Sequence, residues 1–65
     1  MRTIIFDYCN SAFSKCTSAN IDIVDELYSH YISENIETIN ETMLTDIRCN
    51  IIKWYYTNKN IIFLS

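Results

Sequence analysis

The sequence predicts an all-α protein, a single domain over residues 1–65 built as a small bundle of three main helices with a short apolar C-terminal tail. Three observations support this prediction. Apolar residues recur at helical spacing in three stretches of the chain. Hydrophobic residues make up 49% of the sequence against 20% charged, which supplies enough apolar surface for collapse. Glycine and proline are absent, so polar capping residues must set the helix ends.

The first helix is predicted near the start of the chain. Its apolar residues lie three, one, three, one and three positions apart, as on one face of a helix: Ile5, Tyr8, Cys9, Ala12, Phe13 and Cys16. The largely polar residues 17–20 then predict a loop. Within this loop Ser18 or Asn20 is expected to cap the second helix, and Asp22 favours the N-terminus of that helix.

The second helix carries the next apolar stripe, which consists of Val24, Leu27, Tyr28, Tyr31 and Ile32. Residues 33–35 are expected to end this helix. His30 falls away from the stripe, which predicts an exposed histidine.

The third helix is predicted to begin at a capping box, in which Thr38 caps the helix and Glu41 reaches back to Thr38. The apolar stripe that follows consists of Met43, Leu44, Ile47, Ile51, Trp54 and Tyr55. The polar residues 57–60 predict the end of this helix. We expect the apolar residues 61–65 to pack as an extended or helical lid, or to mark the site of a partner.

Acidic residues dominate the middle of the chain. The net charge is −3, and the region between Cys16 and Ile47 has no lysine or arginine but seven acids: Asp22, Asp25, Glu26, Glu34, Glu37, Glu41 and Asp46. This charge disfavours nucleic acid as a ligand. It complements a basic patch on a partner protein, with Asp25 and Glu26 as contacts. The alternative interpretation is that these acids only solvate helix faces and stabilise helix N-termini.

The residues that carry chemistry form no recognisable catalytic or metal-binding motif. Cys9 and Cys16 would lie about 10 Å apart along a helix that rises about 1.5 Å per residue, which is too far to share a zinc ion. Cys49 and His30 add no close spacing, and no orienting third group accompanies them for nucleophilic catalysis. We therefore expect a protein that is not an enzyme and that has no cofactor and no metal.

The cysteines and the hydropathy bear on localisation. Three cysteines are an odd number and lack CxxC spacing, which is typical of reduced thiols rather than of a secreted disulfide scaffold. No apolar run approaches the roughly 20 residues that span a bilayer. We expect an intracellular, cytoplasmic protein without a membrane span.

Aromatic residues are concentrated near the C-terminal end. Trp54, Tyr55 and Tyr56 are adjacent, and neighbours on a helix point about 100° apart, so all three cannot face one core. We predict that part of this surface, together with Phe63, binds a partner. The alternative is a small core that wraps around the helix.

Several short segments share the pattern of a known family. They are Ile4-Ile5-Phe6 with Phe13-Ser14-Lys15, then Leu27-Tyr28-Ser29-His30-Tyr31-Ile32-Ser33, then Ile39-Asn40 with Thr45. Over residues 4–48 the chain thereby resembles the central helices of a regulator of G-protein signalling (RGS) domain. In RGS domains this asparagine lies in a loop that touches the switch regions of the Gα subunit. The resemblance therefore implies a Gα partner and a contact at Asn40.

The sequence thus predicts a non-enzymatic helical module that binds another protein, in an RGS-like version a G-protein α subunit. Two alternatives remain open. One is a small helical modulator, encoded by a virus or phage, that binds a host or defence protein. The heavy use of isoleucine, asparagine and tyrosine fits an AT-rich coding sequence, as in a large DNA virus, a phage, a protist or a low-GC bacterium, and bears only on the source. A chain this short buries a limited core, which favours a helical homo-oligomer, such as a homodimer, with a structural role.

Overall fold

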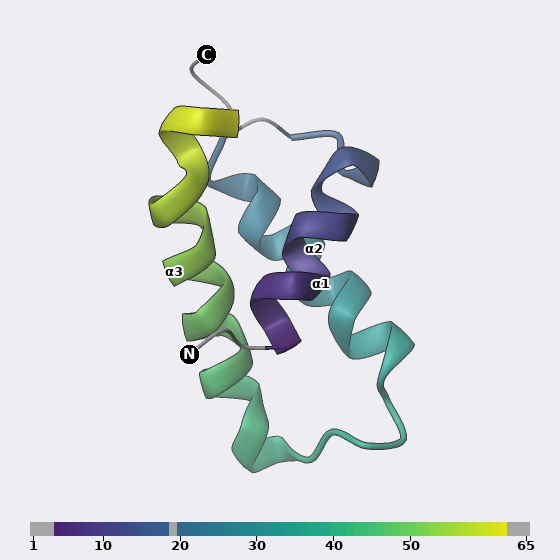
Figure 1. Cartoon of the computed structure of the whole chain (residues 1–65). Coiled ribbons are helices and arrows are strands. Elements are labelled where there is room, and N and C mark those ends of the chain that lie inside the picture. Colours follow the sequence, from purple (N-terminus) through teal and green to yellow (C-terminus); the bar gives the residue numbers. More distant parts are fainter. Residues whose placement is uncertain (1–3, 19, 63–65) are drawn as a thin grey trace.

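The computed structural model describes residues 4–18 and 20–62 and confirms the all-α prediction. The elements in chain order are α1 (Ile4–Ala12), the 3₁₀ turn η1 (Phe13–Lys15), α2 (Asp22–Glu34), the 3₁₀ turn η2 (Glu41–Met43) and α3 (Leu44–Ile62). The long helix α3 packs against both α1 and α2, which also contact each other (Figure 1). Side chains are described for residues 4–18 and 20–58.

The core lies where the apolar faces of the three helices meet. It includes Ile23, which is outside the predicted stripe of the second helix, and excludes Met43, which the sequence placed in the third stripe but which is 38% exposed in η2. Each helix contributes buried side chains, and the largest of them is Trp54 of α3. The buried residues are Cys9, Ala12, Ile23, Val24, Leu27, Ile47, Ile51, Trp54 and Tyr55. No polar or charged residue is buried within the described part of the chain, so apolar packing holds the helices together.

Trp54 joins α3 to α1. Its side chain is fully buried, and its indole Nε1–H donates to Asn10 Oδ1 at 2.9 Å, so the one polar atom of the ring has a partner. The ring of Phe13 packs against the same indole at a tilted angle, with 6.1 Å between the ring centroids. Truncation of a buried aromatic residue of this size typically costs about 3–5 kcal/mol, which is a large part of the stability of a small domain.

The apolar stripe of the first helix continues past the end of α1. The α-helix ends at Ala12, and Phe13–Lys15 form the tighter turn η1 before Cys16 adopts an extended backbone. Phe13 and Cys16 nevertheless pack against the core. The predicted stripe is therefore correct, although its last turn is 3₁₀ rather than α.

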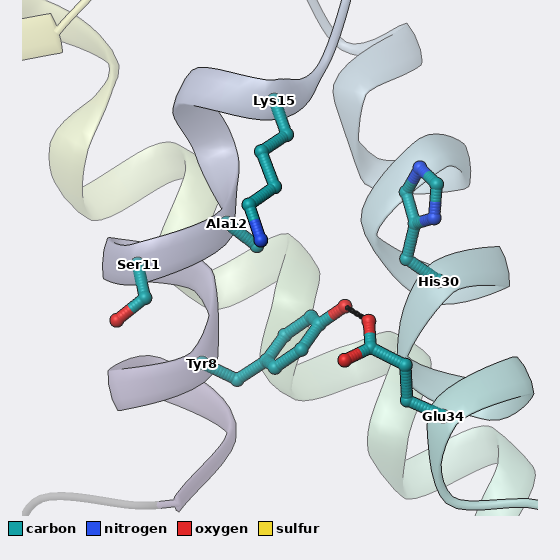
Figure 2. Close-up of a pocket in the computed structure, with 6 residues that line it drawn as sticks. All are labelled: Tyr8, Ser11, Ala12, Lys15, His30 and Glu34. Atoms are coloured by element: carbon teal, nitrogen blue, oxygen red, sulfur yellow. Dashed lines mark hydrogen bonds between the residues drawn. The ribbon is translucent and has the colours of Figure 1, made fainter.

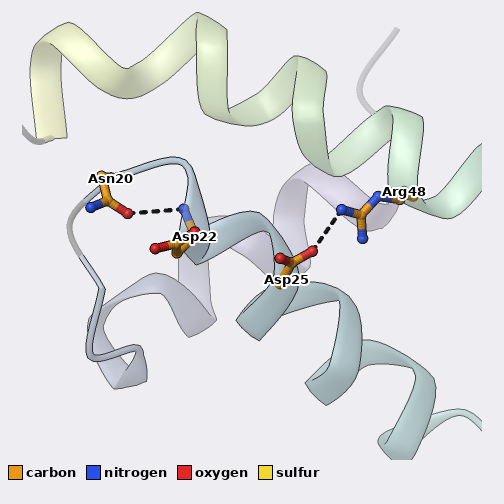
Figure 3. Close-up of polar contacts among 4 residues, drawn as sticks. All are labelled: Asn20, Asp22, Asp25 and Arg48. Atoms are coloured by element: carbon orange, nitrogen blue, oxygen red, sulfur yellow. Dashed lines mark hydrogen bonds and ion pairs between the residues drawn. The ribbon is translucent and has the colours of Figure 1, made fainter.

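The second helix begins and ends where the sequence predicts. Asn20, one of the two candidate caps, accepts the backbone N–H of Asp22 on its Oδ1 at 3.0 Å (Figure 3). At the other end α2 stops at Glu34. There the Nδ2 of Asn35 donates to the carbonyl of Tyr31 at 2.9 Å and satisfies one of the last carbonyls of the helix.

The predicted capping box of Thr38 and Glu41 is wrong. Asn40 caps instead, since its Oδ1 accepts the backbone N–H of Thr42 at 3.1 Å and the hydroxyl of Thr42 at 2.5 Å. The hydroxyl of Thr38 donates to the carbonyl of Asn35 at 3.1 Å, in the turn that follows α2. An asparagine oxygen readily reaches the N–H two residues ahead, so the chain turns as η2 before α3 begins.

The predicted helix end at residues 57–60 is also wrong, because α3 continues to Ile62. No glycine or proline, the residues that most disfavour a helix, interrupts this segment. Asn58 donates its Nδ2–H to the carbonyl of Trp54, four residues back, at 2.9 Å, within the continuing helix. The first two residues of the predicted tail thus belong to α3, and residues 63–65 lie outside the described part of the chain.

Replacing Asn10 with alanine should leave the buried indole N–H of Trp54 without a partner. We expect the free energy of unfolding to fall by about 1–3 kcal/mol, measured by urea denaturation followed by circular dichroism. Ser11→Ala at the neighbouring exposed position is the control, and we expect it to change stability by less than about 0.5 kcal/mol.

A second background isolates this hydrogen bond. Trp54→Phe lacks the indole N–H, so the further change Asn10→Ala should destabilise that variant much less than it destabilises the wild type. An equal loss in both backgrounds would show that Asn10 does not act through Trp54.

Candidate functional site

A pocket lies between α1 and α2, and we refer to it as the α1–α2 pocket. Its volume is about 310 Å³, at the lower end of the range for ligand sites, which suits a single side chain or a small fragment. Six residues line it: Tyr8, Ser11 and Ala12 of α1, Lys15 of η1, and His30 and Glu34 of α2 (Figure 2).

Helical spacing explains why these side chains share one space. Tyr8 and Lys15 are seven residues apart, about two turns, with Ser11 and Ala12 between them. His30 and Glu34 are four residues apart on α2 and therefore lie on the same face. The pocket forms where these two faces meet.

The hydroxyl of Tyr8 connects the two walls of the pocket. It donates to Glu34 Oε2 at 2.5 Å, across the space between α1 and α2 (Figure 2). The ring of Tyr8 also packs edge-on against Tyr31, with centroids 5.1 Å apart and planes at 83°. Burial first, and then the hydrogen bond to Glu34, raise the pKa of Tyr8 well above its usual range. Tyr8 therefore stays protonated and remains a donor at neutral pH.

Lys15 contributes an ammonium group that no other described residue pairs with. Its side chain extends from η1 along the pocket, and Nζ points into the space between α1 and α2 (Figure 2). No hydrogen bond or ion pair with another residue of the described part engages it, although the carboxylate of Glu34 lines the same pocket. The pocket thus combines the apolar surface of Tyr8 and Ala12 with a positive charge that no described residue pairs with, and with the carboxylate of Glu34.

Asp25, predicted as a partner contact, is engaged within the chain. Its Oδ1 lies 2.6 Å from Arg48 Nη2, so this ion pair joins α2 to α3 (Figure 3). Arg48 also lies over the ring of Tyr28, with 5.5 Å between the guanidinium carbon and the ring centroid. The pair is exposed, so we expect it to contribute at most about 1 kcal/mol to stability.

Glu26, the second predicted contact, organises the loop that precedes α2. Its carboxylate accepts the hydroxyl of Thr17 at 2.7 Å, the backbone N–H of Thr17 at 3.1 Å and the backbone N–H of Ser18 at 2.9 Å. These hydrogen bonds, that of the Thr17 hydroxyl above all, lower the pKa of Glu26 to about 2. The carboxylate of Glu26 therefore stabilises the loop before α2, and these internal hydrogen bonds compete with any contact to a partner.

The aromatic residues near the C-terminal end separate into two groups. Trp54 and Tyr55 were predicted as partner contacts, but they are exposed by only 0% and 9% and belong to the core. Tyr56 is 56% exposed and packs edge-on against Tyr55 at 5.2 Å between centroids. The alternative interpretation, a core that wraps around the helix, therefore describes the first two residues. Phe63 lies outside the described residues.

Asn40, which the sequence predicts as a partner contact, lies in the exposed connection between α2 and α3. Its side-chain oxygen is occupied by Thr42, as described above. A contact with a partner would therefore leave the amide nitrogen of Asn40 as the available donor.

The cysteines are free thiols in three different environments: Cys9 is buried, Cys16 is half-buried and Cys49 is exposed. Burial first, and then the neighbouring Cys16, raise the pKa of Cys9 to about 12, and burial also raises the pKa of Cys16. Neither is therefore an activated nucleophile. Among the described residues no three potential ligands come together for a metal ion.

No helix in the described part of the chain has the length and hydropathy to cross a membrane.

The chain matches no protein-family model, no curated protein and no solved structure.

The sequence did not predict that the pocket residues lie together, although His30 is exposed as predicted. The spacing of Tyr8 and Lys15 was a usable signal that they share a face of the first helix. The missing information was which face of α2 packs opposite them.

Replacing Glu26 with glutamine should make the stability of the protein less dependent on pH in the acidic range. Folding lowers the pKa of Glu26 from 4.5 to about 2, so the ionised carboxylate stabilises the protein above about pH 4.5, and this stabilisation is lost as the pH falls toward 2. The Tm of the wild type should therefore fall more steeply over this range than that of Glu26→Gln. Glu37→Gln, at an exposed acid, is the control and should keep the wild-type slope. Equal slopes for all three proteins would contradict the role of Glu26.

Proposed function

We propose that the protein is a non-enzymatic helical module that binds another protein, and that the α1–α2 pocket receives a side chain of that partner. The observation that supports this most is the composition of the pocket. The ring of Tyr8 and the methyl group of Ala12 provide apolar surface, and the polar groups of Lys15, His30 and Glu34 surround it. Apolar pockets with polar rims are typical of the centres of protein interfaces.

The state of the titratable groups favours binding over catalysis. General acid–base chemistry requires a group that can take up and release a proton near the working pH. Tyr8 is held as a donor to Glu34, and the raised pKa values of Cys9 and Cys16 disfavour their thiolates. Lys15 and His30 are exposed at the pocket and suit recognition of a polar group.

The pocket is also preformed. The hydrogen bond between Tyr8 and Glu34 links the two walls of the pocket, and the packing of Phe13 on Trp54 holds the turn η1, which bears Lys15. A surface that is already ordered loses less conformational entropy on binding, which favours affinity.

A Gα subunit is the specific partner that the RGS-like version proposes. The exposed position of Asn40 between α2 and α3 supports it. The other two proposals, a modulator of a host or defence protein and a homo-oligomer, differ in the identity of the partner. A constant monomer mass in light scattering over a concentration series would contradict the homo-oligomer.

Ser11→Arg should block the α1–α2 pocket, because Ser11 is an exposed residue of its lining. Ser14→Arg adds the same side chain at an exposed position outside the lining and is the matched control. For a partner captured by the wild type and identified by mass spectrometry, we expect affinity to fall at least about tenfold, or 1.4 kcal/mol, with Ser11→Arg only. Circular dichroism should show that both variants are folded. Equal binding by both variants would contradict the role of the pocket.

Asn40→Asp tests the Gα proposal without removing the cap, since aspartate retains an oxygen that can accept from Thr42. A Gα subunit loaded with GDP and aluminium fluoride should bind the wild type more tightly than the GDP form does. The variant should lose about tenfold in affinity with its Tm retained, measured by calorimetry. Absent binding, or binding that is indifferent to the nucleotide state, would rule out an RGS-like role.

A further inference from the structure

We infer that the side chain received by the α1–α2 pocket is acidic, with its carboxylate bound by Lys15 and its aliphatic stem packed on the ring of Tyr8. This inference rests on the proposed function, because it names the chemistry of the group that the partner contributes.

Two basic residues differ in how the fold engages their charges. Arg48 is neutralised by Asp25 at 2.6 Å and lies over an aromatic ring, so its charge serves the packing of α2 on α3. Lys15 has no such partner within the described residues, yet its Nζ points into a pocket (Figure 2). An ammonium group has three donors and no acceptor, so the group that complements it must be an acceptor and is best an anion.

Glu34 is already engaged within the pocket. Its carboxylate lines the same pocket but is held at Oε2 by the hydroxyl of Tyr8 at 2.5 Å, and it forms no ion pair with Lys15. A second carboxylate can therefore bind Lys15 without displacing an internal partner. Glu34 would still repel that carboxylate, and this repulsion provides a test of the arrangement.

The shape of the pocket also favours this occupant. The ring of Tyr8 and the side chain of Ala12 give it an apolar wall, and a volume of about 310 Å³ admits one side chain with a short aliphatic stem. His30, across the space on α2, adds an imidazole N–H that can donate to a carboxylate (Figure 2). A glutamate side chain places two methylene groups on the apolar wall and its carboxylate at Lys15.

The direct test is a titration of the ¹⁵N-labelled protein, followed by two-dimensional NMR, with N-acetyl-glutamate amide as the probe. N-acetyl-glutamine amide has the same shape without the charge, and inorganic phosphate is an anion without a stem. We expect saturable shifts at the amides of Tyr8, Ala12 and Lys15 with the glutamate probe, at millimolar concentration. The other two probes should bind at least about tenfold more weakly.

Three variants assign the binding to its residues. Lys15→Met keeps an apolar stem and removes the charge, so binding of the glutamate probe should fall at least about tenfold. Lys53→Met makes the same change at an exposed lysine of α3 outside the pocket and should leave binding unchanged. Glu34→Gln removes the repelling charge but keeps an acceptor for Tyr8, so binding should tighten by a few fold.

Four results would overturn the inference: no saturable shift in the pocket with the glutamate probe, equal binding of the glutamine probe, tighter binding of phosphate, or unchanged binding by Lys15→Met. The proposed function is tested separately, by measuring how the variants bind the captured partner. If Ser11→Arg loses that partner while Lys15→Met binds it as well as the wild type does, the pocket is the binding site and the acidic occupant is wrong. If neither variant weakens capture, the pocket itself is not the site.

Discussion

The burial of Trp54 between the helices is the constraint on which the rest of the structure depends. Its indole fills the centre of the core from α3, and Asn10 of α1 accepts from its one polar atom. Phe13 packs on the same ring from the turn that follows α1. These contacts fix the position of α1, and with it the positions of Tyr8 and Lys15. The pocket between α1 and α2 is thus a consequence of how the core is filled.

Several charged residues are already engaged in ion pairs or hydrogen bonds within the fold. Asp25 is paired with Arg48, and Glu26 is held by three hydrogen bonds from the loop before α2. The sequence predicts the acidic middle region as a surface for a basic partner. In the structure, two of its acids, Asp25 and Glu26, instead form contacts within the chain. Lys15 is the opposite case, because its charge lies at a pocket and the described chain leaves it unpaired.

The sequence predicts the positions of the helices well, because these depend on neighbouring residues. It predicts the contacts between helices poorly, because these depend on which helix faces pack together. Helical periodicity correctly predicted three helices. Asn20, one of the two candidate caps, accepts the backbone N–H of Asp22 at the start of α2, although Ile21 occupies the N-cap position itself. The capping box failed because Asn40 competes with Thr38 for the same role, and local patterns do not rank two good caps. The burial of Trp54 and the joining of Tyr8 to Glu34 are long-range contacts, 44 and 26 residues apart, which spacing alone does not reveal.

Fluorescence of the chain's single tryptophan tests the burial of Trp54 most directly, because the emission reports on one side chain alone. The measurement compares the emission maximum and the quenching by acrylamide in the native and urea-unfolded protein. A Trp54 enclosed by three helices predicts blue-shifted native emission that is strongly protected from the quencher. Native emission as red-shifted and as quenchable as that of the unfolded chain would place Trp54 at the surface and contradict the structural basis of the pocket.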